Sequence, residues 1–144
     1  MNDRLEDILA DKGHDVFRID AGASVFEAVR MMVDANVGSL LVTEGGTVTG
    51  IVTERDYLKR VTLQGRLDRE TAVGEIATSP LIVAGPETTV DECMALMTDR
   101  RIRHVPVVEH GDVVGLVSIG DIVKFRSKQQ TFELRYLTEY ITTH

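Results

Sequence analysis

The segments "GIVTERDYLKR" (residues 50–60) and "GLVSIGDIVKF" (residues 115–125) contain the same strand-to-helix junction. Each reads as a glycine, a short strand rich in β-branched residues, a hydroxyl residue, two further residues, an aspartate and a helix. A shift of 65 residues aligns residues 16–60 with residues 81–125 without a gap, and 12 of the 45 pairs are identical. Because self-similarity at a fixed spacing is the signature of a structural repeat, we predict that the chain folds as two copies of one unit.

The composition is that of an ordinary globular protein. With 144 residues, 43% of them hydrophobic and 27% charged, the chain can form one compact domain with a buried core. Its formal net charge is -7, and an acidic surface repels nucleic acid and anionic lipid, so neither nucleic acid nor membrane is an expected partner. The single cysteine excludes an internal disulfide bond, and no apolar run reaches the length of a signal peptide or a membrane span. We therefore expect a cytoplasmic protein.

Each copy begins with a strand and an amphipathic helix. Residues 16–19 and 81–84 are short apolar runs that predict strands. The next segment of the first copy, "ASVFEAVRMMVDAN", has apolar residues at helical spacing. Ser24 precedes this apolar stripe and Glu27 follows Ser24 by three residues, which predicts a capping box at the start of the helix. The second copy repeats the box with Thr89 and Glu92.

Each copy continues with a hairpin and a second helix. The strands "SLLVT" and "TVTGIVT" meet at Gly45-Gly46, and "VPVVE" and "DVVGLVS" meet at His110-Gly111, where glycine supplies the positive φ of a tight turn. A helix is predicted to begin near Glu54 or Ile119. The fold class is therefore α/β (α+β), with the order β-α-β-β-α twice. Because one copy alone has a thin core, the two should pack together about a pseudo-two-fold axis.

These boundaries predict four parts of the chain. They are a first repeat with an N-terminal helix (residues 1–64), a linker (65–75), a second repeat (76–128) and a C-terminal helix (129–144). The last part has an apolar seam that either packs on its own domain or forms a dimer interface, and periodicity alone favours neither. The seam consists of Phe132, Tyr136, Leu137, Tyr140 and Ile141.

The repeated junction has a structural and a functional interpretation. In the first, a hydroxyl residue with an acid three residues later is a helix cap, and the macrodipole favours a carboxylate in the first turn. In the second, two symmetric clefts each hold a helix N-terminus, which attracts anions, and one carboxylate, Asp56 or Asp121. Such a carboxylate can accept hydrogen bonds from two neighbouring hydroxyls, as acidic residues do when they hold a ribose. With strand backbone available to a purine, these groups predict an adenine nucleotide.

The double β-α-β-β-α unit, "GIVTERD" with "GLVSIGD", and "RIRHVPVVE" resemble a tandem pair of cystathionine-β-synthase (CBS) domains. The resemblance extends from about residue 5 to residue 126, and a pair with nothing catalytic attached is similar to the small stand-alone CBS-pair proteins. It implies adenosyl ligands such as AMP, ADP, ATP, NAD(H) or S-adenosylmethionine, with no catalytic cofactor. It also implies a homodimer that acts as an energy or redox sensor on a regulated protein that the sequence does not identify.

The resemblance implies a role for individual residues. Asp56 and Asp121 would bind the ribose, and Thr53 and Ser118 would bind ribose or phosphate. The hydroxyl after the linker is Thr78, whereas the first copy has Ala10 in that place and an apparent insertion at residues 11–13. The opposite side of each cleft would be lined by Val37 and Gly38 in the first copy and by Ile102 and Arg103 in the second. Phe17 and Ile82 lie on the strands whose backbone would hydrogen-bond to adenine. Lys12 would replace the missing hydroxyl as a partner of the phosphate.

The two copies differ in charge near the clefts. Arg103-His104 aligns with Gly38-Ser39, and a guanidinium with an imidazole binds phosphate better than glycine with serine. We therefore expect the Asp121 cleft to hold the more strongly anchored phosphate, although "DRRIRH" is also consistent with a solvated basic face. Arg55 either pairs locally or points at a second phosphate.

Three classes of function compete. The first is a non-catalytic sensor that binds an adenine nucleotide, and the alternative is an interaction or dimerisation module with vestigial clefts. The third, a nucleotide hydrolase, is disfavoured because no carboxylate pair or metal-ligand cluster accompanies either cleft. Cys93 lies on an apolar helix stripe and is expected to be a core residue, and the isolated histidines do not predict a metal site.

Overall fold

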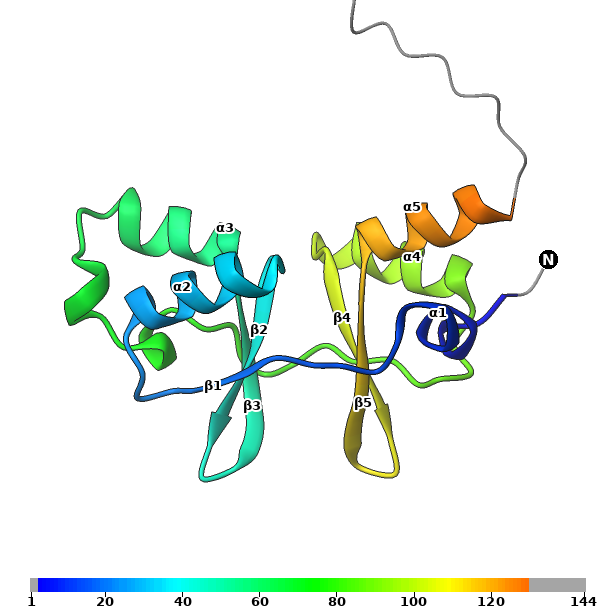
Figure 1. The fold of residues 1–144 in the computed structure, drawn as a ribbon, viewed down its shortest axis with the longest axis horizontal. Helices are drawn as coiled ribbons and strands as arrows, with labels where there is room; N and C mark the ends of the chain where they lie inside the picture. Colours follow the sequence, from blue (N-terminus) through cyan, green and yellow to red (C-terminus); the bar gives the residue numbers. More distant parts are fainter. Residues whose placement is uncertain (1–2, 130–144) are drawn as a thin grey trace, which may run out of the picture.

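The computed structural model describes residues 3–129 and shows two similar halves side by side (Figure 1). Each half places its helices on one side, and its hairpin extends away from them. The repeat predicted from the sequence is confirmed, and so is the α/β fold. The first half contains β1 (Arg18–Asp20), α2 (Val25–Ala35), β2 (Ser39–Glu44), β3 (Thr47–Thr53), α3 (Glu54–Tyr57) and the π-helical turn η1 (Leu58–Thr62), and the second contains α4 (Val90–Arg100), β4 (His104–Glu109), β5 (Asp112–Ser118) and α5 (Ile119–Lys128).

The N-terminal helix α1 (Leu5–Lys12) packs against the second half although it precedes the first repeat in the sequence (Figure 1). Its buried side chains Leu5, Ile8 and Leu9 lie in one cluster with buried residues of α4, β4, β5 and α5. The second half therefore completes its core with a segment from the opposite end of the chain.

The linker packs against the first half in the same way. It forms two short turns, η2 (Asp68–Glu70) and η3 (Val73–Glu75). Val73 and Ile76 are fully buried in one cluster with residues of β1, α2, β2 and β3. Each half thus takes a core segment from the stretch that precedes the other repeat, and this exchange holds the two halves together.

The prediction of a strand at residues 81–84 is wrong. In the first half, β1 pairs in parallel with β2, and β2 pairs antiparallel with β3. The second half has only the antiparallel pair β4 and β5, against which Ala84 forms an isolated bridge with Val107. The predicted first strand, residues 16–19, is present as β1 but begins at Arg18, so Phe17 precedes it.

Two prolines explain why residues 81–84 form no strand. In the first half, Leu41 N donates to Phe17 O at 3.0 Å and Ala21 N donates to Thr43 O at 2.8 Å. A shift of 65 residues places Pro106 at the position of Leu41 and Pro86 at that of Ala21. Proline has no backbone N–H, so neither bond can form in the second half.

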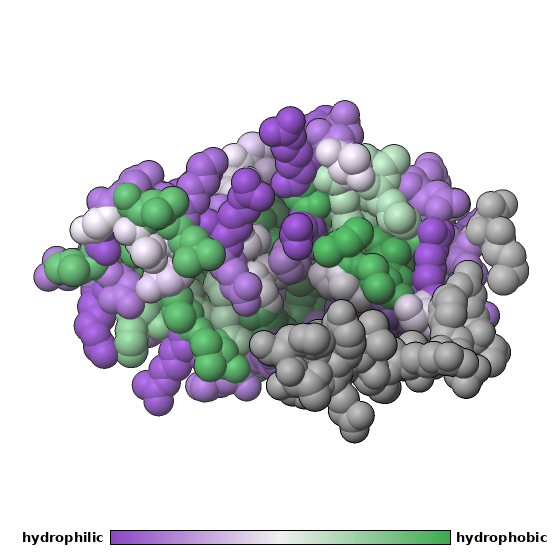
Figure 2. All heavy atoms as spheres, turned by 90° about the horizontal axis from the view of Figure 1, so that it is seen from above, coloured by the Kyte–Doolittle hydropathy of each residue, from purple (hydrophilic) through white to green (hydrophobic). Residues whose placement is uncertain are grey.

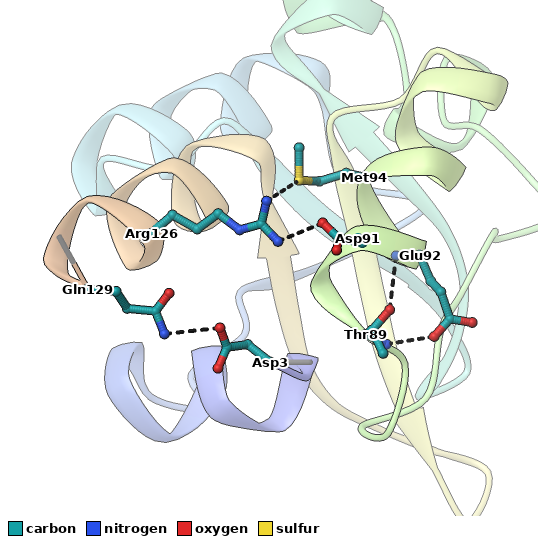
Figure 3. Close-up of polar contacts among 7 residues, drawn as sticks. All are labelled: Asp3, Thr89, Asp91, Glu92, Met94, Arg126 and Gln129. Carbon is teal, nitrogen blue, oxygen red and sulfur yellow. Dashed lines mark hydrogen bonds and ion pairs between the residues drawn. The ribbon is translucent and has the colours of Figure 1, made fainter. Parts of the chain in front are cut away.

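Caps and turns follow the sequence closely. The hairpin turns have positive φ at both central residues, 59° and 83° at Gly45-Gly46 and 52° and 81° at His110-Gly111. The capping box predicted for α4 is complete, because Thr89 and Glu92 each accept the other's backbone N–H (Figure 3). At α2, only the Ser24 hydroxyl caps, accepting from the backbone N–H of residue 27 at 3.1 Å.

Polar contacts attach α5 to its neighbours (Figure 3). Arg126 Nη2 donates to Asp91 Oδ1 of α4 at 2.7 Å, and Arg126 Nη1 lies 3.5 Å from Met94 Sδ. Gln129 Nε2 donates to Asp3 Oδ2 at 3.0 Å, which ties the end of α5 to the segment before α1. The two contacts to carboxylates are exposed, so they orient the helix more than they stabilise it.

Cys93 is fully buried in the second core, and burial raises the pKa of its thiol to about 11. This confirms that it is a core residue. The predicted C-terminal helix and its apolar seam lie outside the described residues. Within residues 3–129, no helix has the length and apolar character needed to cross a membrane.

Candidate functional site

The first junction is a complete capping box between β3 and α3. Thr53 N donates to Asp56 Oδ2 at 2.9 Å, and Asp56 N donates to Thr53 Oγ1 at 3.2 Å. The Thr53 hydroxyl also lies 3.1 Å from Asp56 Oδ2. Asp56 is only 9% exposed, so the end of β3 holds this carboxylate firmly.

The second junction repeats this geometry between β5 and α5. Ser118 N donates to Asp121 Oδ2 at 2.8 Å, and Asp121 N donates to Ser118 Oγ at 3.1 Å. One contact has no counterpart at Asp56 among the described residues: Lys12 Nζ lies 2.7 Å from Asp121 Oδ2. Burial favours a raised pKa at Asp121, but the bonds from Lys12 and Ser118 outweigh it and hold the pKa of this carboxyl below its ordinary value.

The capping bonds use only one oxygen of each carboxylate. Every hydrogen bond to the carboxylate of Asp56 or Asp121 within residues 3–129 goes to Oδ2. No buried side-chain oxygen or nitrogen in that part of the chain lacks a partner, so Oδ1 of Asp56 is in contact with solvent. The capping role of these aspartates therefore leaves Oδ1 of each carboxylate outside the cap.

The two halves meet at Gly38, Glu54 and His104. A Cβ atom at Gly38 would lie 3.5 Å from both Glu54 Oε1 and His104 Nε2. Burial lowers the pKa of His104 below its ordinary value, although the carboxylates of Asp121 and Glu54 oppose this effect. His104 is therefore neutral near pH 7 and can accept or donate a hydrogen bond there.

Different groups satisfy the outer edges of β3 and β5. At β3, the backbone of Thr78 donates to Ile51 O at 2.8 Å and accepts from Ile51 N at 3.1 Å. At β5, the position equivalent to Ile51 is Leu116, whose carbonyl instead accepts from Lys12 Nζ at 2.8 Å. The insertion recognised at residues 11–13 therefore substitutes a cationic side chain for backbone at this edge.

The remaining predicted residues are scattered. Arg55 is exposed on α3, and its side chain makes no hydrogen bond or ion pair with the residues that the structure describes. Val37 and Gly38 line a hollow of about 540 Å³ between α2 and α3, and Phe17 lines another of about 500 Å³ beside α2. Asp56 and Asp121 line neither hollow. Ile102 packs against the second core, Ile82 is half-buried and Arg103 is exposed.

The sequence interpretation did not include two residues that lie near its predicted site residues. Glu54 lies beside His104, and its alignment with Ile119 already marked a charge present in one copy only. His14 Nδ1 lies 2.9 Å from Val114 O, next to the insertion. Among residues 3–129, no cluster of three or more His, Cys, Asp or Glu side chains is arranged to hold a metal ion.

Comparison with known families gives this geometry a context. The model of the CBS domain matches residues 5–62 and again residues 73–128. The chain belongs to the CBS-domain family. Its two halves are the two CBS domains of a tandem pair, and Asp56 and Asp121 occupy the same position in each.

Two curated relatives are similar to this chain over most of its length. The mitochondrial CBS domain-containing protein CBSX3 of Arabidopsis thaliana is 45% identical over 123 residues, which are 82% of this chain and 60% of the plant protein. The protein YhcV of Bacillus subtilis is 34% identical over 107 residues, 74% of this chain and 76% of that protein. The chain therefore spans less than two thirds of the plant protein's length.

Solved structures of CBS-domain proteins have the same fold as this chain. A CBS-domain protein from Burkholderia ambifaria, assigned to signal transduction, superimposes on this chain with a TM-score of 0.88 at 40% sequence identity. The superposition covers 92% of this chain and 99% of the Burkholderia chain. The CBS pair of protein MJ0100, solved with 5′-methylthioadenosine and S-adenosyl-L-methionine, has a TM-score of 0.78 at 25% identity, over 90% and 100%. The CBS-CP12 protein of bloom-forming cyanobacteria, with a TM-score of 0.80 at 26% identity over 99% and 83%, is hexameric.

Proposed function

We propose that this CBS pair is a non-catalytic regulatory protein that binds an adenosine-containing ligand in the clefts marked by Asp56 and Asp121. The observation that carries the proposal is the duplicated carboxylate, which the end of a strand holds through Oδ2 while Oδ1 takes no part in the cap. Two hydroxyls on adjacent ribose carbons are suited to bind such a carboxylate. The complex of the related MJ0100 pair with two adenosyl compounds supports this class of ligand.

The candidate ligands are AMP, ADP, ATP, NAD(H) and S-adenosylmethionine. Thr53 and Ser118 lie beside the carboxylates and would add a hydroxyl contact to ribose or phosphate. Arg103 and His104 occur only in the second copy, which favours a phosphate at the Asp121 cleft. Regulation requires the ligand to bind two conformations with different affinities, so that occupancy changes how the pair contacts the protein it regulates.

Titration calorimetry with AMP, ATP, NADH and S-adenosylmethionine tests the proposal. At least one ligand is expected to bind below millimolar concentration, and the double variant Asp56→Ala/Asp121→Ala should weaken it by at least about tenfold because both charge-assisted contacts are lost. The matched control is Glu44→Ala/Glu109→Ala, which removes two equivalent, exposed carboxylates at the far ends of β2 and β4. The proposal fails if no ligand binds below millimolar concentration, or if the Asp56→Ala/Asp121→Ala variant binds as well as the control.

We also propose that the protein is a homodimer formed through the helical face. Leu58 of η1 and Val123 of α5 are equivalent in the two copies and are 56% and 60% exposed, and Val33 of α2 is 72% exposed. Figure 2 shows apolar side chains gathered on this side of the molecule. A second copy can cover both halves at once, because the pseudo-two-fold axis repeats the apolar positions, and the hexameric cyanobacterial relative is a precedent for self-association.

Analytical ultracentrifugation tests the dimer. The variant Leu58→Asp/Val123→Asp should sediment as a monomer. The control Val83→Asp puts a charge at an exposed position between η3 and α4 and should leave the dimer intact. A monomeric wild-type protein, or a dimer that survives Leu58→Asp/Val123→Asp, contradicts this interface. If dimers form but no nucleotide binds, the alternative of an interaction module with vestigial clefts is favoured.

A further inference from the structure

Lys12 makes the two clefts chemically different. It is the last residue of α1, and its ammonium group bonds at once to Asp121 Oδ2 at 2.7 Å and to Leu116 O at 2.8 Å. In the equivalent place beside Asp56, the backbone N–H of Thr78 bonds to Ile51 O at 2.8 Å. A full positive charge therefore sits against one of the two carboxylates, and a neutral amide occupies the equivalent edge of the other.

The contact can be broken by a ligand. The side chains of Lys12 and Asp121 are 32% and 23% exposed, and an ion pair at this exposure stabilises the fold only modestly. The chain at residues 12–14 contacts β5 through the side chains of Lys12 and His14. In the first half, by contrast, Thr78 is held on β3 by two backbone hydrogen bonds. Lys12 can therefore leave Asp121 without disrupting a backbone ladder.

We propose that Lys12 determines the specificity of the Asp121 cleft, admitting adenosyl ligands that carry a phosphate and excluding those that carry none. The inference rests on the proposed function, because it assumes that Asp121 binds a ribose. A ribose presents two adjacent hydroxyls, and when they bind both oxygens of the Asp121 carboxylate, one of them competes with Lys12 for Oδ2. A phosphorylated ligand supplies a new anionic partner for the displaced ammonium, whereas an unphosphorylated ligand leaves it without one.

AMP and adenosine are the probes, because they differ only in the phosphate. Calorimetry is performed in an Asp56→Ala background, so that the Asp121 cleft gives the signal. We expect AMP to bind at least about tenfold more tightly than adenosine, and Lys12→Met to reduce this ratio to about twofold, as a phosphate contact with a cationic side chain is lost. Lys12→Arg keeps the charge and should retain the preference.

The matched control is Lys128→Met. Lys128 Nζ pairs with Asp11 Oδ2 at 3.1 Å, so it also connects α5 with α1, and its replacement changes the net charge equally without touching Asp121. This variant should leave the ratio of AMP to adenosine affinity unchanged. A measurement without ligand tests the Lys12 contact independently. The pKa of Asp121, measured by ¹³C NMR of its carboxyl carbon, should be higher in Lys12→Met than in the wild-type protein, because the contact that lowers it is lost.

The outcomes separate this inference from the function it rests on. If wild-type protein binds AMP but Lys12→Met keeps the same preference over adenosine, the role of Lys12 is refuted and the proposed function stands. If no adenosyl ligand binds the wild-type protein, the proposed function fails and the inference falls with it. If Lys128→Met reduces the ratio as much as Lys12→Met does, net charge explains the preference and the role of Lys12 is again refuted.

Discussion

At the level of single residues, Asp56 and Asp121 combine a structural with a proposed functional role. Each closes a capping box through Oδ2, so its position in the sequence is explained by helix capping alone. Helix capping does not explain why the surroundings of the two carboxylates differ: Lys12 contacts Asp121, whereas within residues 3–129 no cationic side chain contacts Asp56. Alanine at either position removes the cap as well as the proposed ligand contact, so the unfolding free energy of each alanine variant must be measured beside its ligand affinity.

His104 should make the stability of the protein depend on pH. Burial lowers its pKa in the folded state, so between the ordinary pKa of histidine and this lower value the unfolded chain binds more protons. The contribution of His104 is fully present above the ordinary pKa and is lost as the pH falls through it toward the folded value. We expect urea denaturation at about pH 7.5 and 5.5 to show a smaller loss of unfolding free energy for His104→Gln than for wild type. Equal losses in the two proteins would contradict this.

At the level of elements, the glycine that opens each repeated junction is explained by a close approach from outside its own hairpin. A Cβ atom at Gly50 would lie 2.8 Å from Thr78 O, and one at Gly115 would lie 2.6 Å from the Leu9 side chain. The repeat predicts both glycines, but the segments that press on them come from the linker and from α1. The same position in two equivalent strands is thus crowded by two different segments, by backbone at Gly50 and by a side chain at Gly115.

Alanine at these glycines should destabilise the protein unequally. Gly50→Ala must displace the Thr78 carbonyl, which accepts from Ile51 N, whereas Gly115→Ala can be relieved by reorientation of the Leu9 side chain. We expect a loss of about 1–3 kcal/mol for Gly50→Ala and a smaller one for Gly115→Ala, measured by urea denaturation. The packing assigned to β3 and β5 is wrong if Gly115→Ala is the more destabilising of the two.

At the level of the whole molecule, the exchange of core segments makes the repeats interdependent. The second half buries Leu5, Ile8 and Leu9 of α1, which stands at the other end of the sequence. Neither repeat as cut from the sequence therefore contains all of its own core. A chain of this size has little hydrophobic stability to spare, so losing three large buried side chains from one half is severe.

Removal of α1 should unfold the second half. A chain that begins at residue 14 loses the three buried side chains of α1 and the Lys12 contact, and we expect the amide signals of residues 90–128 to lose their dispersion in ¹⁵N–¹H NMR spectra. The variant Glu6→Ala, at an exposed position of α1, is the control and should retain the full spectrum. Dispersed signals from the second half of the shortened chain would show that α1 is dispensable.

The sequence by itself determined the repeat, the order of the main helices and hairpins, the hairpin turns and both aspartate junctions, because these depend on patterns in the sequence itself. Only the tertiary structure decided that α1 completes the second half, that residues 81–84 form no strand beside Pro106, and that Lys12 reaches Asp121 across 109 positions of the chain. These features depend on how distant segments dock, and docking is set by the shape and packing of both halves together. Local periodicity carries no signal for it.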